Sequence, residues 1–154
     1  MLSPLLPPDT GEMALRLFAA ALIGCGIGID REVRGKPAGM RTHALVALGA
    51  ALVTLIVVRV TPPNVEHVDA ISRVIQGIIA GVGFLGGGAI LKSAESVHGL
   101  TTAASIWFVA AVGAACGTGQ WVAALIAVAF AFLILIGGLA AEKVMRRIFG
   151  PHEP

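Results

Sequence analysis

Two groups of residues have types and spacings that could support chemistry, and the first is a run of glycines. Gly81, Gly83 and Gly86 form a G-x-G-x-x-G pattern, which in dinucleotide-binding folds brings a backbone turn and a helix N-terminus against a pyrophosphate. That use requires a strand before the glycines and a helix after them. Here the glycines lie inside one apolar run with no break before Lys92. The pattern therefore does not predict a nucleotide site.

The second group is a pair of carboxylates, Asp30 and Glu32, which are candidate ligands for a metal such as magnesium. Mg²⁺ prefers carboxylate oxygens and retains several waters. Arg31 lies between the two residues and can neutralise either of them. No Ser-His-Asp or Cys-His set, zinc spacing or phosphate-binding lysine loop stands out, so we expect neither an enzyme nor a cofactor.

These carboxylates belong to a larger set of polar residues that flank two bends between apolar segments. If the two bends pack together, the set forms one polar cluster, and we expect function there first. Its members are Asp30, Arg31, Glu32, Arg41, Thr42, His43, Lys92, Thr101 and Thr102. Simpler roles stay open for several of them, because basic residues also set membrane topology and threonines also cap helix N-termini.

The composition indicates that a membrane must position these residues. Hydrophobic residues make up 56% of the 154 and charged residues only 13%, whereas soluble domains have about a quarter of their residues charged. Apolar segments that are long enough to span a bilayer, or nearly so, alternate with short polar bends. They predict an all-α, polytopic membrane protein with five transmembrane helices, over Met13–Ile29, Ala44–Val58, Ala70–Leu91, Leu100–Cys116 and Trp121–Ala141.

We expect three parts along the chain: a short periplasmic leader over residues 1–12, a transmembrane domain over residues 13–141 and a short cytoplasmic tail over residues 142–154. Lysine and arginine are concentrated in the tail and in the bends after the first and third segments. The positive-inside rule then places the N-terminus outside and the C-terminus in the cytoplasm. The net charge of +2 indicates no nucleic-acid partner.

Glycines spaced four residues apart predict close helix packing, because they place small residues on one helix face. This spacing is found in apolar sequence for Gly24 and Gly28, Gly77 and Gly81, Gly83 and Gly87, and Gly113 and Gly117. In the third segment we predict packing or hinge roles for Gly77, Gly81, Gly83, Gly86, Gly87 and Gly88. Such faces also predict self-association, most simply as a symmetric dimer.

Two stretches of the chain resemble the signatures of the MgtC/SapB family of membrane proteins. The first is Gly28-x-Asp30-Arg31-Glu32, followed by the run from Gly39 to Val46. The second is the run from Gly81 to Lys92 together with the run from Gly99 to Trp107. The resemblance covers about Met13 to Ala140. It implies a multi-pass protein of the bacterial inner membrane.

The resemblance also implies a function. Archetypal family members help bacteria to tolerate magnesium limitation and to survive inside host cells, and are thought to restrain the F-type ATP synthase instead of carrying magnesium. It thus predicts a regulator of membrane energetics or ion homeostasis that contacts membrane proteins such as this synthase. The alternative is a small ion or solute transporter that uses a broken glycine-rich helix. The archetype has a soluble domain after its last helix, and we expect only the transmembrane part here.

Overall fold

The computed structural model of the chain describes residues 9–62, 65–92 and 96–150, with the backbone alone for residues 65, 66, 91, 92, 139–144, 146 and 149. Five helices make up nearly all of it: α1 (Thr10–Val33), α2 (Met40–Val60), α3 (Val65–Gly88), α4 (Leu100–Thr118) and α5 (Trp121–Phe149). Each contains a stretch that is long and apolar enough to cross a membrane. The predicted all-α fold with five spanning helices is confirmed.

The helices differ from the apolar segments mainly at their ends. α3 begins at Val65, inside the stretch predicted as a polar bend, and α5 continues to Phe149 through the charged residues after Ala141. Glutamate, lysine and arginine are good helix formers, so charge ends the apolar segment without ending the helix. α3 ends at Gly88, three residues before the predicted limit at Leu91.

A short hairpin, which was not predicted, connects α3 to α4. β1 (Leu91–Lys92) pairs in antiparallel fashion with β2 (Val97–His98). Gly99 then turns the chain into α4 with φ +90°. A Cβ at Gly99 would lie 2.0 Å from the carbonyl oxygen of Ala89, so both the dihedral angle and the close approach require glycine.

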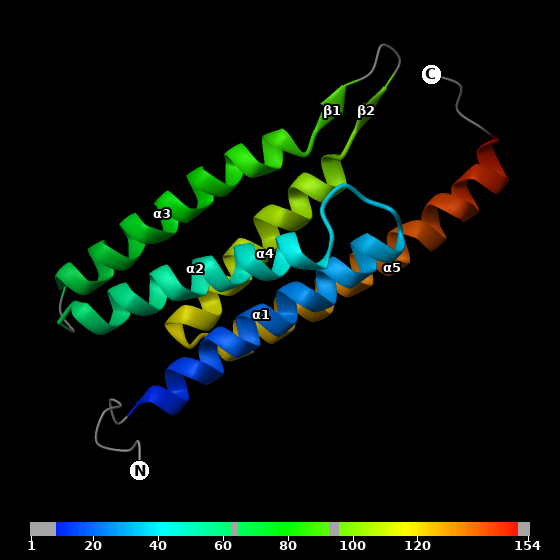
Figure 1. Cartoon of the computed structure of the whole chain (residues 1–154). Helices are drawn as coiled ribbons and strands as arrows, with labels where there is room; N and C mark the ends of the chain where they lie inside the picture. The colour runs from blue at the N-terminus through cyan, green and yellow to red at the C-terminus, as the bar shows by residue number, and fades with distance from the viewer. Residues whose placement is uncertain (1–8, 63–64, 93–95, 151–154) are drawn as a thin grey trace.

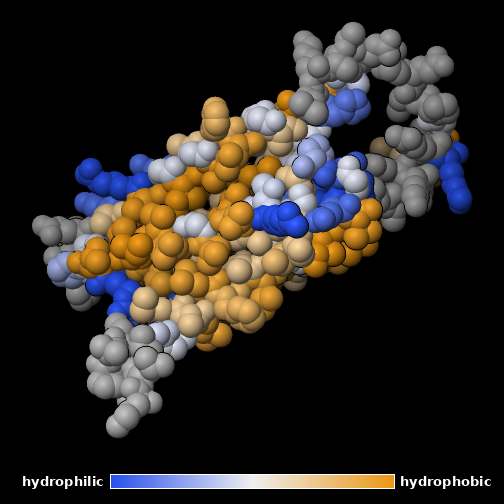
Figure 2. Space-filling model, viewed as in Figure 1, coloured by the Kyte–Doolittle hydropathy of each residue, from blue (hydrophilic) through white to orange (hydrophobic). Residues whose placement is uncertain are grey.

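The connections gather at two opposite ends of the bundle (Figure 1). The hairpin end contains the α1–α2 bend (residues 34–39), the hairpin and the start of α4. The N-terminal end contains the start of α1, the end of α2 and the end of α4. Figure 2 shows hydrophobic side chains over the middle of the bundle and hydrophilic ones toward its two ends, as a membrane requires.

Helices α1, α2 and α4 form the closely packed centre, and α3 and α5 flank it. Of the spanning part of α4, 56% is buried, against 6% for α3 and 11% for α5. Small residues make this centre possible. A Cβ on Gly24 or Gly28 of α1 would come within 2.6 or 2.5 Å of the α2 backbone, and one on Gly113 or Gly117 of α4 within 2.2 or 2.5 Å of it. The packing role predicted for these two pairs is confirmed.

The glycines of α3 are placed differently. Gly86 packs on α4, where a Cβ added to it would lie 3.6 Å from the nearest atom of Ala103. At the other five, an added Cβ would meet no atom of a neighbouring element within 4 Å among the described residues, namely at Gly77, Gly81, Gly83, Gly87 and Gly88. A helix that packed closely against these five glycines would therefore belong to another molecule, and their packing role stays a prediction. α3 is one unbroken helix that ends at the glycine triplet.

Candidate functional site

Arg31 is a buried arginine in the last turn of α1, at the hairpin end. Only 4% of the residue is exposed. Its Nη2 donates a hydrogen bond to Oγ1 of Thr102 in α4, at 2.9 Å, and its Nε has no partner among the described residues. The ion pairs seen in the described part of the chain involve other arginines. Arg31 is therefore a buried cation that is held by a hydroxyl group.

The glycines of α1 explain why Arg31 is buried. Gly24, Gly28 and Arg31 lie on one face of the helix, because residues three and four apart are neighbours on a helix surface. Gly28 brings that face against the first turn of α2, where an added Cβ would lie 2.5 Å from Cα of Met40. The arginine, one turn further on, is consequently directed between the helices toward α4.

His43 of α2 joins the same region and is 0% exposed. Its Nδ1 lies 2.9 Å from the carbonyl oxygen of Gly39, and its Nε2 lies 2.9 Å from Oγ of Ser105. Since a carbonyl oxygen only accepts, Nδ1 carries a proton. The Ser105 hydroxyl has one proton and two acceptors within reach, the Nε2 of a neutral His43 and the carbonyl oxygen of Thr102 at 2.8 Å. These contacts link α2 to α4.

The two carboxylates proposed as metal ligands have other partners. Asp30 forms an ion pair with Arg34 at 2.7 Å, and this hydrogen-bonded carboxylate raises the pKa of Arg34. Glu32 accepts a hydrogen bond from the N–H of Met40 at 2.9 Å. It thereby caps α2, whose N-cap residue is a glycine. The described residues contain no group of three or more His, Cys, Asp or Glu side chains that could hold a metal. Metal binding by Asp30 and Glu32 stays a prediction.

The predicted polar cluster is thus assembled only in part. Arg31, His43 and Thr102 are buried together, with Thr102 1% exposed. Three other members of the cluster lie at the surface: Arg41, Thr42 and Thr101. Lys92 lies in β1, and its side chain is outside the described part of the structure.

Ser105 was missed, although its sequence position offered a signal. It lies three residues after Thr102 in an otherwise apolar helix, so the two share a helix face. A serine at that position has to find a hydrogen-bond partner inside the bundle. The sequence gives no indication that the partner is His43.

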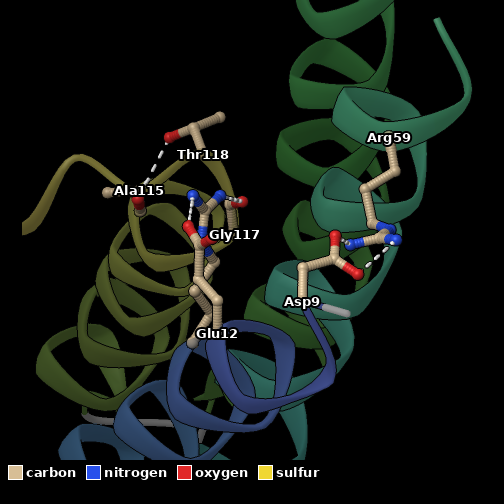
Figure 3. Close-up of polar contacts among 7 residues, drawn as sticks. Asp9, Glu12, Arg59, Ala115, Gly117 and Thr118 are labelled. Carbon is tan, nitrogen blue, oxygen red and sulfur yellow. Dashed lines mark hydrogen bonds and ion pairs between the residues drawn. The ribbon is translucent and has the colours of Figure 1, made fainter. Parts of the chain in front are cut away.

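The N-terminal end contains a second set of polar contacts (Figure 3). Arg59 at the end of α2 pairs with Asp9, and its Nη2 lies 3.0 Å from Oδ1. This hydrogen bond lowers the pKa of Asp9. Arg16 of α1 pairs with Glu12 and donates through Nη1 to the carbonyl oxygen of Gly117, at 2.8 Å. Both arginines therefore have a carboxylate from the chain itself.

Comparison with known proteins supplies the family. The sequence profile of the MgtC family matches residues 17–144. SrpB of Synechococcus elongatus is 44% identical over 141 residues, which cover 86% of this chain and 78% of SrpB. MgtC of Salmonella typhimurium is 40% identical over 134 residues, which cover 87% of this chain and 54% of MgtC.

The Escherichia coli protein named "Putative magnesium transporter YhiD" is 44% identical over 117 residues, which cover 73% of this chain and 54% of YhiD. The chain therefore spans about half the length of MgtC and of YhiD. No solved structure is similar to it. The family profile covers most of the chain, and the stretch that it covers contains the buried Arg31, His43 and Thr102. The chain belongs to the MgtC family.

Proposed function

We propose that this protein contributes to magnesium homeostasis by contacting other membrane proteins, and that it does not itself conduct ions. One observation carries this proposal, the exposed outer face of α3. This face consists of residues that fall on one side of the helix and are all exposed: Arg73, Gln76, Gly77, Ala80, Phe84 and Gly87. We call it the α3 outer face.

The α3 outer face is poorly suited to lipid. Gln76 lies within the spanning part of α3, is exposed, and has no hydrogen-bond partner in the described chain. An amide in hydrocarbon is costly unless another polar group pairs with it. Gly77 and Gly87 leave room for a neighbouring backbone, and Phe84 projects between them with 84% of its surface exposed. A partner helix would satisfy the amide and cover the phenyl ring.

The centre of the bundle supports contact over conduction. The charged side chains of α1 and α2 that the structure describes lie toward the two ends of the bundle, as at Arg16 and Arg31. Between those ends the packed residues are apolar and mostly small, including Ala20, Ala47, Ala50, Ala51, Ile106 and Val109. An ion path needs polar or charged groups along its length. Transport is the second candidate, and the name of the E. coli relative favours it.

The proposed setting is the bacterial inner membrane with the hairpin end in the cytoplasm. Arg34, Lys36 and Arg41 at that end support this orientation through the positive-inside rule. The partner class is a membrane protein, and the F-type ATP synthase is the candidate that the family resemblance suggests. A second copy of the chain is the other candidate for the same face.

Complementation at limiting magnesium tests the proposal. A strain that lacks the gene would express the wild type, Gln76→Leu, Gly87→Leu or the control Gly137→Leu. Gly137 of α5 also has no contact within 4 Å of a Cβ position, so its variant adds the same bulk elsewhere. We expect the two α3 variants to be made and folded but to lose growth rescue and cross-linking to membrane partners. The control should keep both.

Two results would overturn the proposal. One is full rescue and unchanged cross-linking by both α3 variants. The other is a magnesium flux across liposomes that contain only the purified protein, which would favour the transporter. Cross-links that join only two copies of the chain would identify the partner as a second copy.

A further inference from the structure

A cavity of about 420 Å³ lies at the hairpin end, between the α1–α2 bend and the start of α4. Its polar side chains come from the last turn of α1, the α1–α2 bend, β2 and the start of α4: Arg31, Lys36, His98, Thr101 and Thr102. No acidic residue of the described chain lines it. The cavity therefore combines one buried and one exposed basic side chain with hydroxyl and imidazole groups, and contains no anion of its own.

The buried guanidinium of Arg31 is the main reason to expect an anion here. Removing a cation from water is costly, and an anion within hydrogen-bonding distance reduces that cost. The nearest carboxylates in sequence form no ion pair with Arg31: Asp30, whose charge still favours the guanidinium, is paired with Arg34, and Glu32 caps α2. Arg31 lines the cavity, and its Nε, which is itself enclosed, has no partner among the described residues.

The start of α4 supplies a second, independent preference for an anion. The first N–H groups of a helix, here those of Leu100 to Thr102, have no intrahelical acceptor and carry a partial positive charge. The N-cap residue is Gly99, and no side chain of the described chain caps the helix. Gly99, Leu100, Thr101 and Thr102 all line the cavity. An anion in the cavity would therefore meet a helix N-terminus and the Arg31 guanidinium together.

We infer that this cavity binds a phosphoryl group. Phosphate oxygens match both the planar fork of an arginine and the N–H groups of a helix N-terminus. Lys36, at the exposed side of the cavity, would add a second positive charge. The group can belong to free phosphate or to the headgroup of an anionic phospholipid, because the cavity lies at the end of the bundle where headgroups would be. The inference does not depend on the proposed function.

Two binding measurements on the full chain distinguish these sources. The first follows thermal unfolding in a neutral detergent during titration with inorganic phosphate, against sodium chloride at equal ionic strength. The second uses native mass spectrometry after reconstitution into vesicles of phosphatidylglycerol or of phosphatidylcholine. Phosphate-dependent stabilisation indicates the free anion. Selective retention of phosphatidylglycerol indicates the lipid.

Matched variants test the site itself. Lys36→Gln should weaken whichever binding is found about tenfold, the value of one charge-assisted hydrogen bond, and Arg31→Gln should abolish it. Arg41→Gln is the control, since Arg41 is exposed at the same end and does not line this cavity. Arg41→Gln removes one positive charge, as Lys36→Gln does. This variant should bind phosphate or phosphatidylglycerol as tightly as the wild type does.

The inference is overturned if the wild type shows neither phosphate-dependent stabilisation nor retention of phosphatidylglycerol. It is also overturned if Lys36→Gln and Arg41→Gln weaken binding equally, because binding would then follow net charge and not the cavity. Arg31 is buried, so Arg31→Gln could fail to fold. Lys36→Gln changes an exposed residue and keeps the test decisive in that case.

Discussion

The two ends of the bundle differ in how the arginines that contact another helix are partnered. At the N-terminal end, Arg16 and Arg59 each pair with a carboxylate of the same chain, Glu12 and Asp9. At the hairpin end, Arg31 is 4% exposed, and among the described residues the hydroxyl of Thr102 is the only hydrogen-bond partner of its side chain. At the hairpin end Arg34 is likewise paired with Asp30, so the difference lies in Arg31, a buried arginine without an ion pair. The difference indicates that the N-terminal contacts hold helices together, whereas the hairpin end can attract an external anion.

Packing, in contrast, is equally close at the two ends, and replacing one glycine at each end tests this. A Cβ at Gly28 would lie 2.5 Å from Met40, and one at Gly117 would lie 2.5 Å from Ala51. Because the atoms met belong to the α2 backbone, we expect Gly28→Val and Gly117→Val each to cost about 4 kcal/mol or more and to abolish folded protein.

Size-exclusion chromatography and thermal unfolding in detergent would measure both variants. Gly49→Val is the control, since Gly49 has no contact within 4 Å of a Cβ position, and it should change stability by less than about 1 kcal/mol. A folded Gly28→Val protein would show that α1 and α2 are further apart at the hairpin end than the structure has them. The burial of Arg31 would then be in doubt.

The buried polar contacts should also differ in energy between the ends. His43→Leu removes both hydrogen bonds of the imidazole and leaves the Ser105 hydroxyl without its link to α2, so we expect a loss of about 2–3 kcal/mol. Thr54→Val, toward the N-terminal end, removes only a bond to the carbonyl oxygen of Ala50 in its own helix. That change should cost less than about 1 kcal/mol.

Denaturant titration of the two variants beside the wild type measures these losses. Ser105→Ala is a useful companion to His43→Leu, because it removes the serine partner and keeps the imidazole. Equal losses for His43→Leu and Thr54→Val would contradict the view that the polar link between helices belongs to the hairpin end.

The smallest effect is expected from the pairing of Asp9 with Arg59. The folded chain holds the pKa of Asp9 below its ordinary value of about 3.9. This contact therefore stabilises the fold above about pH 4, and the contribution is lost as the pH falls through the lowered pKa. Asp9→Asn should melt slightly below the wild type near pH 6, and the two should converge in acid. A difference that persists at low pH would mean that the contact is not ionic.

The fold was predictable because spanning helices are encoded locally. Apolar length and charged flanks identified five helices and their order. The ends of α3 and α5 were misplaced, since hydropathy changes where the bilayer ends and a helix continues as long as its residues favour it. The β1–β2 hairpin was missed because two-residue strands carry no periodic signal.

The candidate site was predictable by residue but not by partner. Arg31, His43 and Thr102 were all expected near one another. The sequence did not indicate that Arg41 and Thr42, which were assigned to the same cluster, would be exposed. Glycine spacing predicted close packing equally for α1 and for α3. The structure places Gly28 against α2 and leaves Gly83 without a neighbour within 4 Å in the described chain.

The sequence by itself therefore determined that this is a five-helix membrane protein with most of its charged residues near the helix ends, because hydropathy and helix length act along a local stretch. The pairs of Glu12 with Arg16 and of Asp30 with Arg34 are also local, since each joins residues four apart in the chain. Only the tertiary structure decided the partners of Arg31 and Arg59. Arg31 meets Thr102 across 71 residues of chain, and Arg59 meets Asp9 across 50. Such pairings depend on which helix faces approach, and that is decided by close contacts between helices that no local pattern records.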